Sequence, residues 1–190
     1  PIYGKVCTEP PFENIFVPPV PDDSGCSVGA AFFVHNQLNG SPRKYVMTSN
    51  YLGPEYDDTE IRSELERCKL EFEELDDPSR KAAELIAESN ILGWFQGRLE
   101  FGDRALGNRS ILADPRLEKM KDMVNETVKY REPFRPFAPS ILAEYLDDYF
   151  VDGQPTPFME MVFPICDEKR AEITAVTHVD GSGRLHTLTR

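Results

Sequence analysis

The sequence predicts a mixed α/β (α+β) fold, and three observations predict it. Segments with helical spacing of apolar residues alternate along the chain with short apolar runs typical of strands. The chain has 190 residues, 40% apolar and 28% charged, which is enough for one ordinary domain with a core, or one domain and part of another. No apolar stretch reaches the length of a membrane span, so a membrane protein is not expected.

In the first half of the chain, the sequence predicts two strands and three helices, followed by a third strand that is buried. Asp77 is a suitable N-cap because Pro78 then occupies the first helical position, where a missing N–H costs nothing. The sequence NGSPRKYV breaks the preceding helical pattern, so a domain boundary is expected between about 38 and 54. The expected elements are a strand over 14–17, a helix over 27–38, a helix capped by Thr59, a strand over 70–75, a helix over 78–90 and a buried strand over 91–96.

The second half begins with Asp114-Pro115, a cap-plus-proline pair that predicts the start of another helix. Apolar residues at helical spacing support this helix, and the proline-rich residues 131–140 that follow are expected to form an ordered loop. The remaining expected elements are a helix over 141–150 capped by Ser140, a strand over 158–165, and a strand, turn and strand over 173–188. The apolar stripe of the helix after Pro115 consists of Leu117, Met120, Val124 and Val128.

Charge is unevenly distributed along the chain. The net charge is −12, which argues against general nucleic-acid binding through a basic face. Residues 98–135 nevertheless hold nine Lys/Arg and seven Asp/Glu, a net of +2. A basic segment in an acidic chain indicates an anion site. The four scattered cysteines form no CxxC pair, so we expect incidental thiols in a reducing cytoplasm rather than zinc ligands or disulfides.

Two segments contain the chemistry expected of an anion site. Glycines in residues 97–110 allow backbone N–H groups to approach an anion, and guanidinium groups bind oxyanions through paired hydrogen bonds. The alternative is that these arginines pair with Glu100, Asp103 and Asp114. In residues 128–140, prolines and aromatic residues hold three more cations, which suits a polyphosphate; the alternative is an ordinary surface loop. The candidate cations are Arg98, Arg104, Arg109, Lys129, Arg131 and Arg135.

Two shorter motifs are compatible with binding or catalysis. In THVDGSGR, His178 and Asp180 precede a glycine turn and Arg184, and a His-x-Asp pair can bind a metal or relay a proton. A structural histidine near a hairpin is the alternative. In PDDSGCSVGAA, Asp23 lies at the entrance of a small-residue helix, where it suits a metal ligand, a phosphate site or an ordinary helix cap.

Together these motifs resemble the O-carbamoyltransferase family that includes the nodulation-factor, cephamycin, novobiocin and tobramycin carbamoylating enzymes. The matching segments occur in family order and cover most of the chain. The resemblance implies that residues 1–38 are the end of an actin-like ATPase (Kae1-like) domain, 39–55 a linker, and 56–190 a truncated YrdC-like domain with a twisted mixed sheet and flanking helices. The matches are FVPPVPDDSGCSVGAA, YLGPEY, GWFQGRLEFGDRALGNRSILADPR, MKDMVNETVKYREPFRPFAPSIL and THVDGSGRLHT.

The resemblance also implies a reaction. Carbamoyl phosphate and ATP, with Mg²⁺, would give carbamoyl-adenylate, and a hydroxyl of a small-molecule or sugar acceptor would then take the carbamoyl group. The six candidate cations would contact phosphate or carbamoyl oxygens, Ser110 would donate a hydrogen bond, and His178, Asp180 and Arg184 would lie near the same cavity. Asp23 matches an aspartate that binds iron (Fe²⁺) in the family.

The sequence departs from the family pattern at several positions and lacks some of the family's segments. Asp103 replaces the family's proline, and Gly183 and His186 replace an alanine and a glutamine. The chain begins at Pro1, and neither the family's histidine pair for the metal nor its later NTSFN-like motif is present, so we expect an excised piece that is inactive by itself. A non-catalytic nucleotide- or phosphate-binding module is the main alternative, and an RNA-binding YrdC-like domain is opposed by the net charge of −12. The protein is expected to be cytoplasmic.

Overall fold

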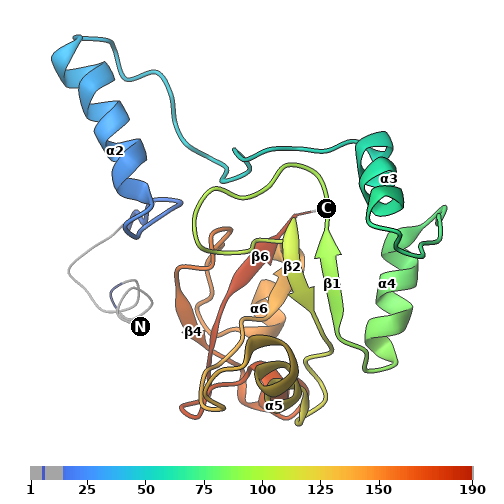
Figure 1. The fold of residues 1–190 in the computed structure, drawn as a ribbon. Helices are drawn as coiled ribbons and strands as arrows, with labels where there is room; N and C mark the ends of the chain where they lie inside the picture. Colours follow the sequence, from blue (N-terminus) through green and yellow to red (C-terminus); the bar gives the residue numbers. More distant parts are fainter. Residues whose placement is uncertain (1–5, 7–14, 190) are drawn as a thin grey trace.

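The computed structural model describes residue 6 and residues 15–189, and it has a mixed α/β architecture (Figure 1). Within these residues the strands form three two-stranded ladders rather than one continuous sheet. The antiparallel ladders pair β1 (Leu92–Phe95) with β2 (Arg109–Leu112) and β4 (Val162–Pro164) with β5 (Ser182–Arg184), and the parallel ladder pairs β3 (Ser140–Leu142) with β6 (His186–Leu188).

The longer helices lie in the first half of the chain, and Figure 1 shows α2 standing apart from the strands. No helix among the described residues is long and apolar enough to cross a membrane. The α-helices are α2 (Gly25–Phe33), α3 (Asp58–Arg67), α4 (Pro78–Ala87), α5 (Met120–Val124), α6 (Leu146–Tyr149) and α7 (Asp167–Arg170). Shorter helical turns cover Val34–Leu38, Asn125–Lys129, Ala143–Tyr145 and Thr174–Val176.

Local capping explains where α3 and α4 begin. The Asp77 side chain accepts a hydrogen bond from the Arg80 N–H and Pro78 is the first helical residue, which confirms the predicted start of α4. In α3 the cap is Asp57, not the predicted Thr59. Asp57 and Glu60 form a capping box, in which each side chain accepts from the other residue's N–H.

Two predicted strands in the first half are wrong. Residues 70–75 alternate in hydropathy but form no strand, and Leu70, Phe72 and Leu75 remain 57%, 42% and 41% exposed. Residues 15–17 are also without regular structure, and Asn14 lies outside the described residues. In both places the local pattern suits a strand, but no strand of residue 6 or residues 15–189 lies alongside to complete its backbone hydrogen bonds.

Two predicted starts in the second half are also wrong. Asp114 accepts hydrogen bonds from the backbone N–H and guanidinium of Arg116 instead of capping a helix, and α5 begins only at Met120. Ser140 does not cap a helix, because it starts β3 and pairs with His186. Residues 173–188 hold a helical turn where the first strand was expected, and the two strands that follow pair with β4 and β3 rather than with each other.

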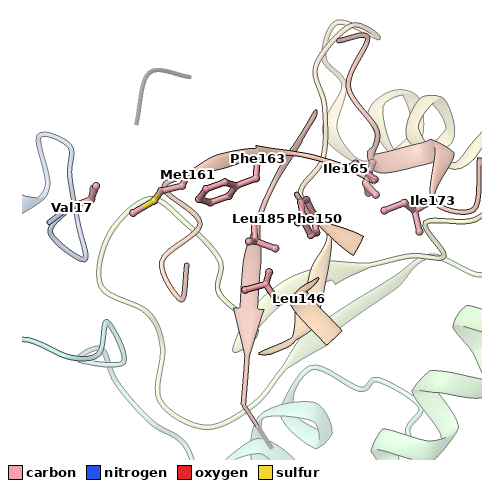
Figure 2. Packing of buried hydrophobic residues seen from close by; sticks show 9 residues of the cluster. Val17, Leu146, Phe150, Met161, Phe163, Ile165, Ile173 and Leu185 are labelled. Atoms are coloured by element: carbon pink, nitrogen blue, oxygen red, sulfur yellow. The ribbon is translucent and has the colours of Figure 1, made fainter. Parts of the chain in front are cut away.

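The main hydrophobic core lies around β4, β5 and α6 (Figure 2). Phe163, Ile165 and Leu185 are at most 1% exposed. Leu185 joins β5 directly to β6, so one stretch of chain belongs to an antiparallel ladder and then to a parallel ladder. The face of β4 and β5 opposite Phe163 and Leu185 carries Arg184, since side chains alternate along a strand.

Candidate functional site

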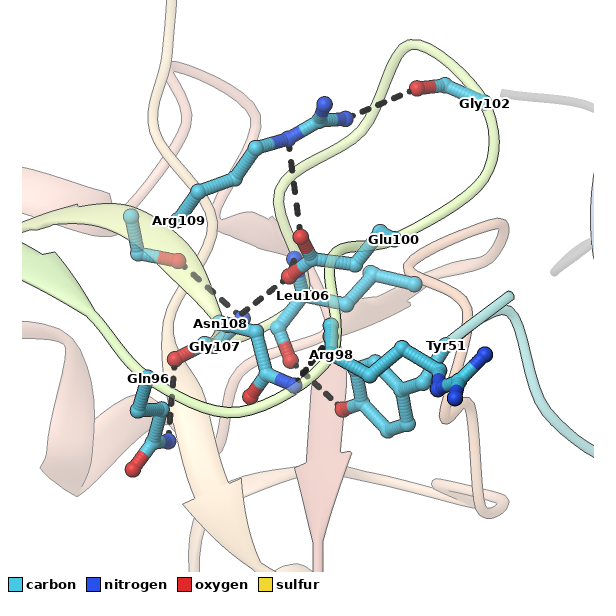
Figure 3. A network of polar contacts seen from close by, with 10 residues as sticks. Tyr51, Gln96, Arg98, Glu100, Gly102, Leu106, Gly107, Asn108 and Arg109 are labelled. Carbon is cyan, nitrogen blue, oxygen red and sulfur yellow. Dashed lines mark hydrogen bonds and ion pairs between the residues drawn. The ribbon is translucent and has the colours of Figure 1, made fainter. Parts of the chain in front are cut away.

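The arginine- and glycine-rich segment is the connection between β1 and β2, and Glu100 organises it (Figure 3). The Glu100 side chain is fully buried. Its Oε1 accepts hydrogen bonds from the backbone N–H of Leu106 at 2.7 Å and of Asn108 at 2.8 Å. Tyr51, within the expected linker, donates its hydroxyl proton to the Leu106 carbonyl at 2.9 Å. The backbone N–H groups in this part of the loop therefore bind a protein carboxylate.

Arg98 and Arg109 are neutralised within the fold. The Arg109 Nε lies 3.5 Å from Glu100 Oε2, and its Nη2 donates to the Gly102 carbonyl at 2.9 Å (Figure 3). Arg98 lies 3.7 Å from Glu55 on the surface. Ser110 accepts a hydrogen bond from the Gly107 N–H at 3.0 Å. The alternative to an anion site is that the arginines pair with Glu100, Asp103 and Asp114. The structure agrees with this alternative for Arg109, which pairs with Glu100, whereas Arg98 pairs with Glu55.

Arg104 has a different environment, which it shares with Arg184 and Arg131. Arg104 Nη1 and Arg184 Nε are buried and have no hydrogen-bond partner among the described residues. Burial lowers the pKa of Arg184, and the positive charges of Arg104 and Arg131 lower it further. One cation from each predicted segment thus lies close to Arg184. We call Arg104, Arg131 and Arg184 the arginine cluster.

The second predicted segment is held on buried Asn125, which is 0% exposed. Asn125 Oδ1 accepts from Arg131 Nε at 2.7 Å, and its Nδ2 donates to the Arg135 carbonyl at 3.2 Å. The Arg131 guanidinium also lies 4.6 Å from the centre of the Phe137 ring, a cation–π contact. Arg135 pairs with Glu132 at 3.1 Å, whereas Lys129 is exposed and forms no ion pair within the described chain. Arg131 is therefore held in place by a buried amide and an aromatic ring.

His178 and Asp180 are linked through Ser182 at the start of β5. The Ser182 hydroxyl lies 2.6 Å from Asp180 Oδ1 and 3.1 Å from His178 Nδ1. His178 Nε2 is buried without a partner among the described residues. Burial lowers the pKa of His178, which the charge of Asp180 raises and that of Arg184 lowers further. The imidazole is therefore neutral at pH 7 and lies near the arginine cluster.

Acidic groups near Arg104 were not singled out as site residues from the sequence. Asp22 and Asp103 share a carboxyl–carboxyl hydrogen bond, which lowers the pKa of Asp22, and burial together with Asp22 raises the pKa of Asp103. Glu160 has a buried, unpartnered Oε2, and burial raises its pKa against the opposing charge of Arg104. The DD pair and the aspartate in GDRALG were visible in the sequence, but nothing local indicated that they meet.

A metal ion has little support in the described part of the chain. Asp23, the expected ligand, is exposed, and no group of three or more His, Cys, Asp or Glu side chains is placed to hold a metal there. Asp23 by itself cannot complete an iron or Mg²⁺ site, and both metals stay predictions of the family resemblance.

The arginine cluster contributes no residue to the wall of a cavity of about 560 Å³. Apolar side chains of α5, α6 and the strands dominate its wall, and none of the predicted site residues lines it. Phe137 is shared, because it contacts Arg131 and also lines the cavity. The polar chemistry and the apolar cavity are therefore two separate features.

The protein has a mixed α/β fold in which a hairpin connection, a proline-rich loop and a strand each contribute one arginine to the arginine cluster. A family model described as the carbamoyltransferase C-terminus matches residues 83–190, which is more than half of the chain. The chain therefore belongs to the carbamoyltransferase family, as the motifs predicted, and the matched region contains all three residues of the cluster.

Relatives agree with this assignment. The chain is 45% identical to nodulation protein NolNO of Sinorhizobium fredii over 100% of this chain and 29% of that protein. It is 42% identical to nodulation protein NolO of Bradyrhizobium diazoefficiens, covering 100% of this chain and 36% of that protein, and 38% identical to nodulation protein U of Rhizobium tropici, covering 94% and 29%. The chain thus spans about a third of the length of these relatives.

Proposed function

We propose that this chain is the part of an O-carbamoyltransferase that binds carbamoyl phosphate and ATP and forms carbamoyl-adenylate. The observation that supports the proposal most directly is the arginine cluster, in which Arg104 and Arg184 have buried N–H groups without a partner in the described part of the chain. We further propose that residues 56–190 form the YrdC-like unit and residues 1–38 the end of the Kae1-like unit, joined by residues 39–55. ATP as co-substrate places the reaction in the cytoplasm.

Electrostatics favour an oxyanion at the cluster. The charges of Arg104 and Arg131 lower the pKa of Arg184, and the Asp103 carboxylate opposes this effect only in part. Repulsion of this kind costs free energy, which a bound anion offsets. A buried donor without an acceptor costs about 1–3 kcal/mol, and a phosphate or carbamoyl oxygen supplies that acceptor. Charge-assisted hydrogen bonds from arginine to phosphate are also among the strong ones. A polyphosphate removes both costs.

The proposed reaction balances in three steps. Water splits carbamoyl phosphate into carbamate and inorganic phosphate, and a carbamate oxygen then attacks the α-phosphorus of ATP and releases pyrophosphate. A hydroxyl of the acceptor attacks the carbonyl carbon of carbamoyl-adenylate, loses its proton and releases AMP. Arg104 and Arg184 bind the oxygens on which charge develops, and Arg131 adds to the positive potential. Lys129 and Arg135 border the approach, while Arg98 and Arg109 hold the loop through Glu55 and Glu100.

Titration calorimetry of the full-length protein with ATP and with carbamoyl phosphate tests this function. Arg184→Met is expected to weaken binding of at least one of the two ligands tenfold or more, because a charge-assisted hydrogen bond is lost. Arg80→Met is the matched control, since Arg80 is exposed on α4 and pairs only with Glu84. Wild-type protein that binds neither ligand, or an Arg184→Met variant with unchanged affinities, contradicts the proposal.

A non-catalytic binding module is the second candidate, favoured by the Asp103 carboxylate beside Arg104. A binding module and an enzyme differ in whether they release pyrophosphate. Pyrophosphate released from ATP only when carbamoyl phosphate is present supports catalysis, and binding of both ligands without pyrophosphate supports the module.

A further inference from the structure

Asp180, Ser182 and His178 form a hydrogen-bonded chain whose proton positions follow from chemistry. Asp180 is ionised and can only accept, so the 2.6 Å contact requires that Ser182 donates its single hydroxyl proton to it. Ser182 Oγ must then accept the proton of His178 Nδ1–H across 3.1 Å. The neutral imidazole carries its only proton on Nδ1. Its Nε2 is therefore a hydrogen-bond acceptor.

The described residues provide no donor for this acceptor. His178 Nε2 is buried and unpartnered within the described residues, and the same holds for Arg184 Nε, the neighbouring donor. His178 Nδ1 contacts the Ser182 hydroxyl, and the side chains of Ser182 and Arg184 lie on the same face of β5 because side chains alternate along a strand. The charge of Arg184 accordingly lowers the pKa of His178. An unpaired acceptor thus lies beside an unpaired donor. A ligand that satisfies both must offer an oxygen and an N–H group close together.

We propose that His178 is the specificity-determining residue that selects the carbamoyl group, by accepting a hydrogen bond from its NH₂ at Nε2 while Arg184 binds its oxygen. This inference rests on the proposed function. The oxygen and the NH₂ of a carbamoyl group share one carbon, which matches a donor and an acceptor on one hairpin. Acetyl phosphate has a methyl group in place of the NH₂ and leaves Nε2 unpaired. Ser182 and Asp180 are positioning residues, since they hold the imidazole in the accepting tautomer.

Binding of carbamoyl phosphate and acetyl phosphate to the full-length protein tests the proposal by calorimetry. The affinity of wild-type protein for carbamoyl phosphate should be roughly tenfold higher than for acetyl phosphate, because acetyl phosphate leaves the buried Nε2 atom unpaired. His178→Asn keeps a donor toward Ser182 but lacks an acceptor at the Nε2 position, so the preference should fall to about one. His178→Gln places an amide oxygen near that position and should restore part of the preference. His35→Asn, at an exposed histidine, is the matched control.

The outcomes separate this inference from the proposed function. If wild-type protein binds carbamoyl phosphate without preference over acetyl phosphate, or if His178→Asn retains the preference, the role of His178 is wrong while the anion site stands. If wild-type protein binds neither acyl phosphate nor ATP, the proposed function itself fails. Should His178→Asn not fold, judged by thermal unfolding, Ser182→Ala takes its place, because loss of the tautomer lock should reduce the preference several-fold; an unchanged ratio overturns the proposal.

Discussion

Replacement of Glu100 by alanine is expected to destabilise the arginine- and glycine-rich loop strongly. The Glu100 carboxylate accepts hydrogen bonds from two backbone N–H groups, those of Leu106 and Asn108, at 2.7 and 2.8 Å. Each donor left without an acceptor costs about 1–3 kcal/mol, the larger value applying to Leu106, which is only 2% exposed. The sum predicts a loss of about 4–6 kcal/mol in the free energy of unfolding.

Glu100→Gln separates the hydrogen bonds from the charge. The amide keeps one oxygen for the two N–H groups and gives up only the contact with Arg109, which is 3.5 Å long and partly exposed at the arginine. Such a pair is worth about 0–1 kcal/mol, so Glu100→Gln should cost far less than Glu100→Ala. Glu118→Ala, at an exposed carboxylate, serves as the surface control.

Urea denaturation measures these differences, read as midpoint shifts at a constant slope. The reasoning is refuted if Glu100→Ala lies within about 0.5 kcal/mol of the wild-type protein, the range of ordinary surface substitutions. Equal losses for the alanine and glutamine variants would also refute it, because the charge rather than the backbone hydrogen bonds would then be responsible.

Two further predictions concern the core and the pH dependence. Phe163→Ala should lower the free energy of unfolding by about 3–5 kcal/mol in urea denaturation, because Phe163 is 1% exposed. Phe134→Ala is the control, since its ring is 78% exposed and the free energy of unfolding should change by no more than about 0.5 kcal/mol. Similar losses for the two variants would contradict the packing described. Burial lowers the pKa of His178 and His186 in the folded protein. As pH falls below about 6.5, the ordinary pKa of histidine, the unfolded chain therefore binds more protons than the folded protein. The free energy of unfolding should accordingly rise with pH up to about 6.5 and then level off. His178→Asn should reduce that slope without abolishing it, and a slope of opposite sign would disprove the assignment.

Local signals predicted the elements that depend on local interactions. The Asp77-Pro78 start of α4, the strand that contains Trp94 and the irregular proline-rich loop follow from caps, hydropathy and proline geometry. Ser140 shows the limit of such reasoning, because its short-range context suits a helix cap. It starts a strand because His186, far along the chain, pairs with it. Backbone pairing at that separation leaves no local trace in the sequence.

The candidate site also divides into features that local sequence predicts and features that depend on distant contacts. The basic segments identified the region that holds the arginine cluster, yet Arg98 and Arg109 are engaged by Glu55 and Glu100. Which arginines remain unpaired depends on distant contacts. The family resemblance named Arg104, Arg131 and Arg184 among a larger set of candidates, and Arg184 follows Arg104 by 80 residues in the numbering. Only the folded chain separates these three from the candidates that have carboxylate partners.

The position of Leu185 has a consequence for how the protein opens. This fully buried residue joins the strand that carries Arg184 to the strand that pairs with Ser140. Neither ladder can detach without withdrawing Leu185 from its packing, so amide protons of β3 to β6 should exchange with solvent as one cooperative unit. The Arg184 side chain is thereby attached to this cooperative unit, whereas Arg104 lies on a loop whose backbone is held by the Glu100 carboxylate.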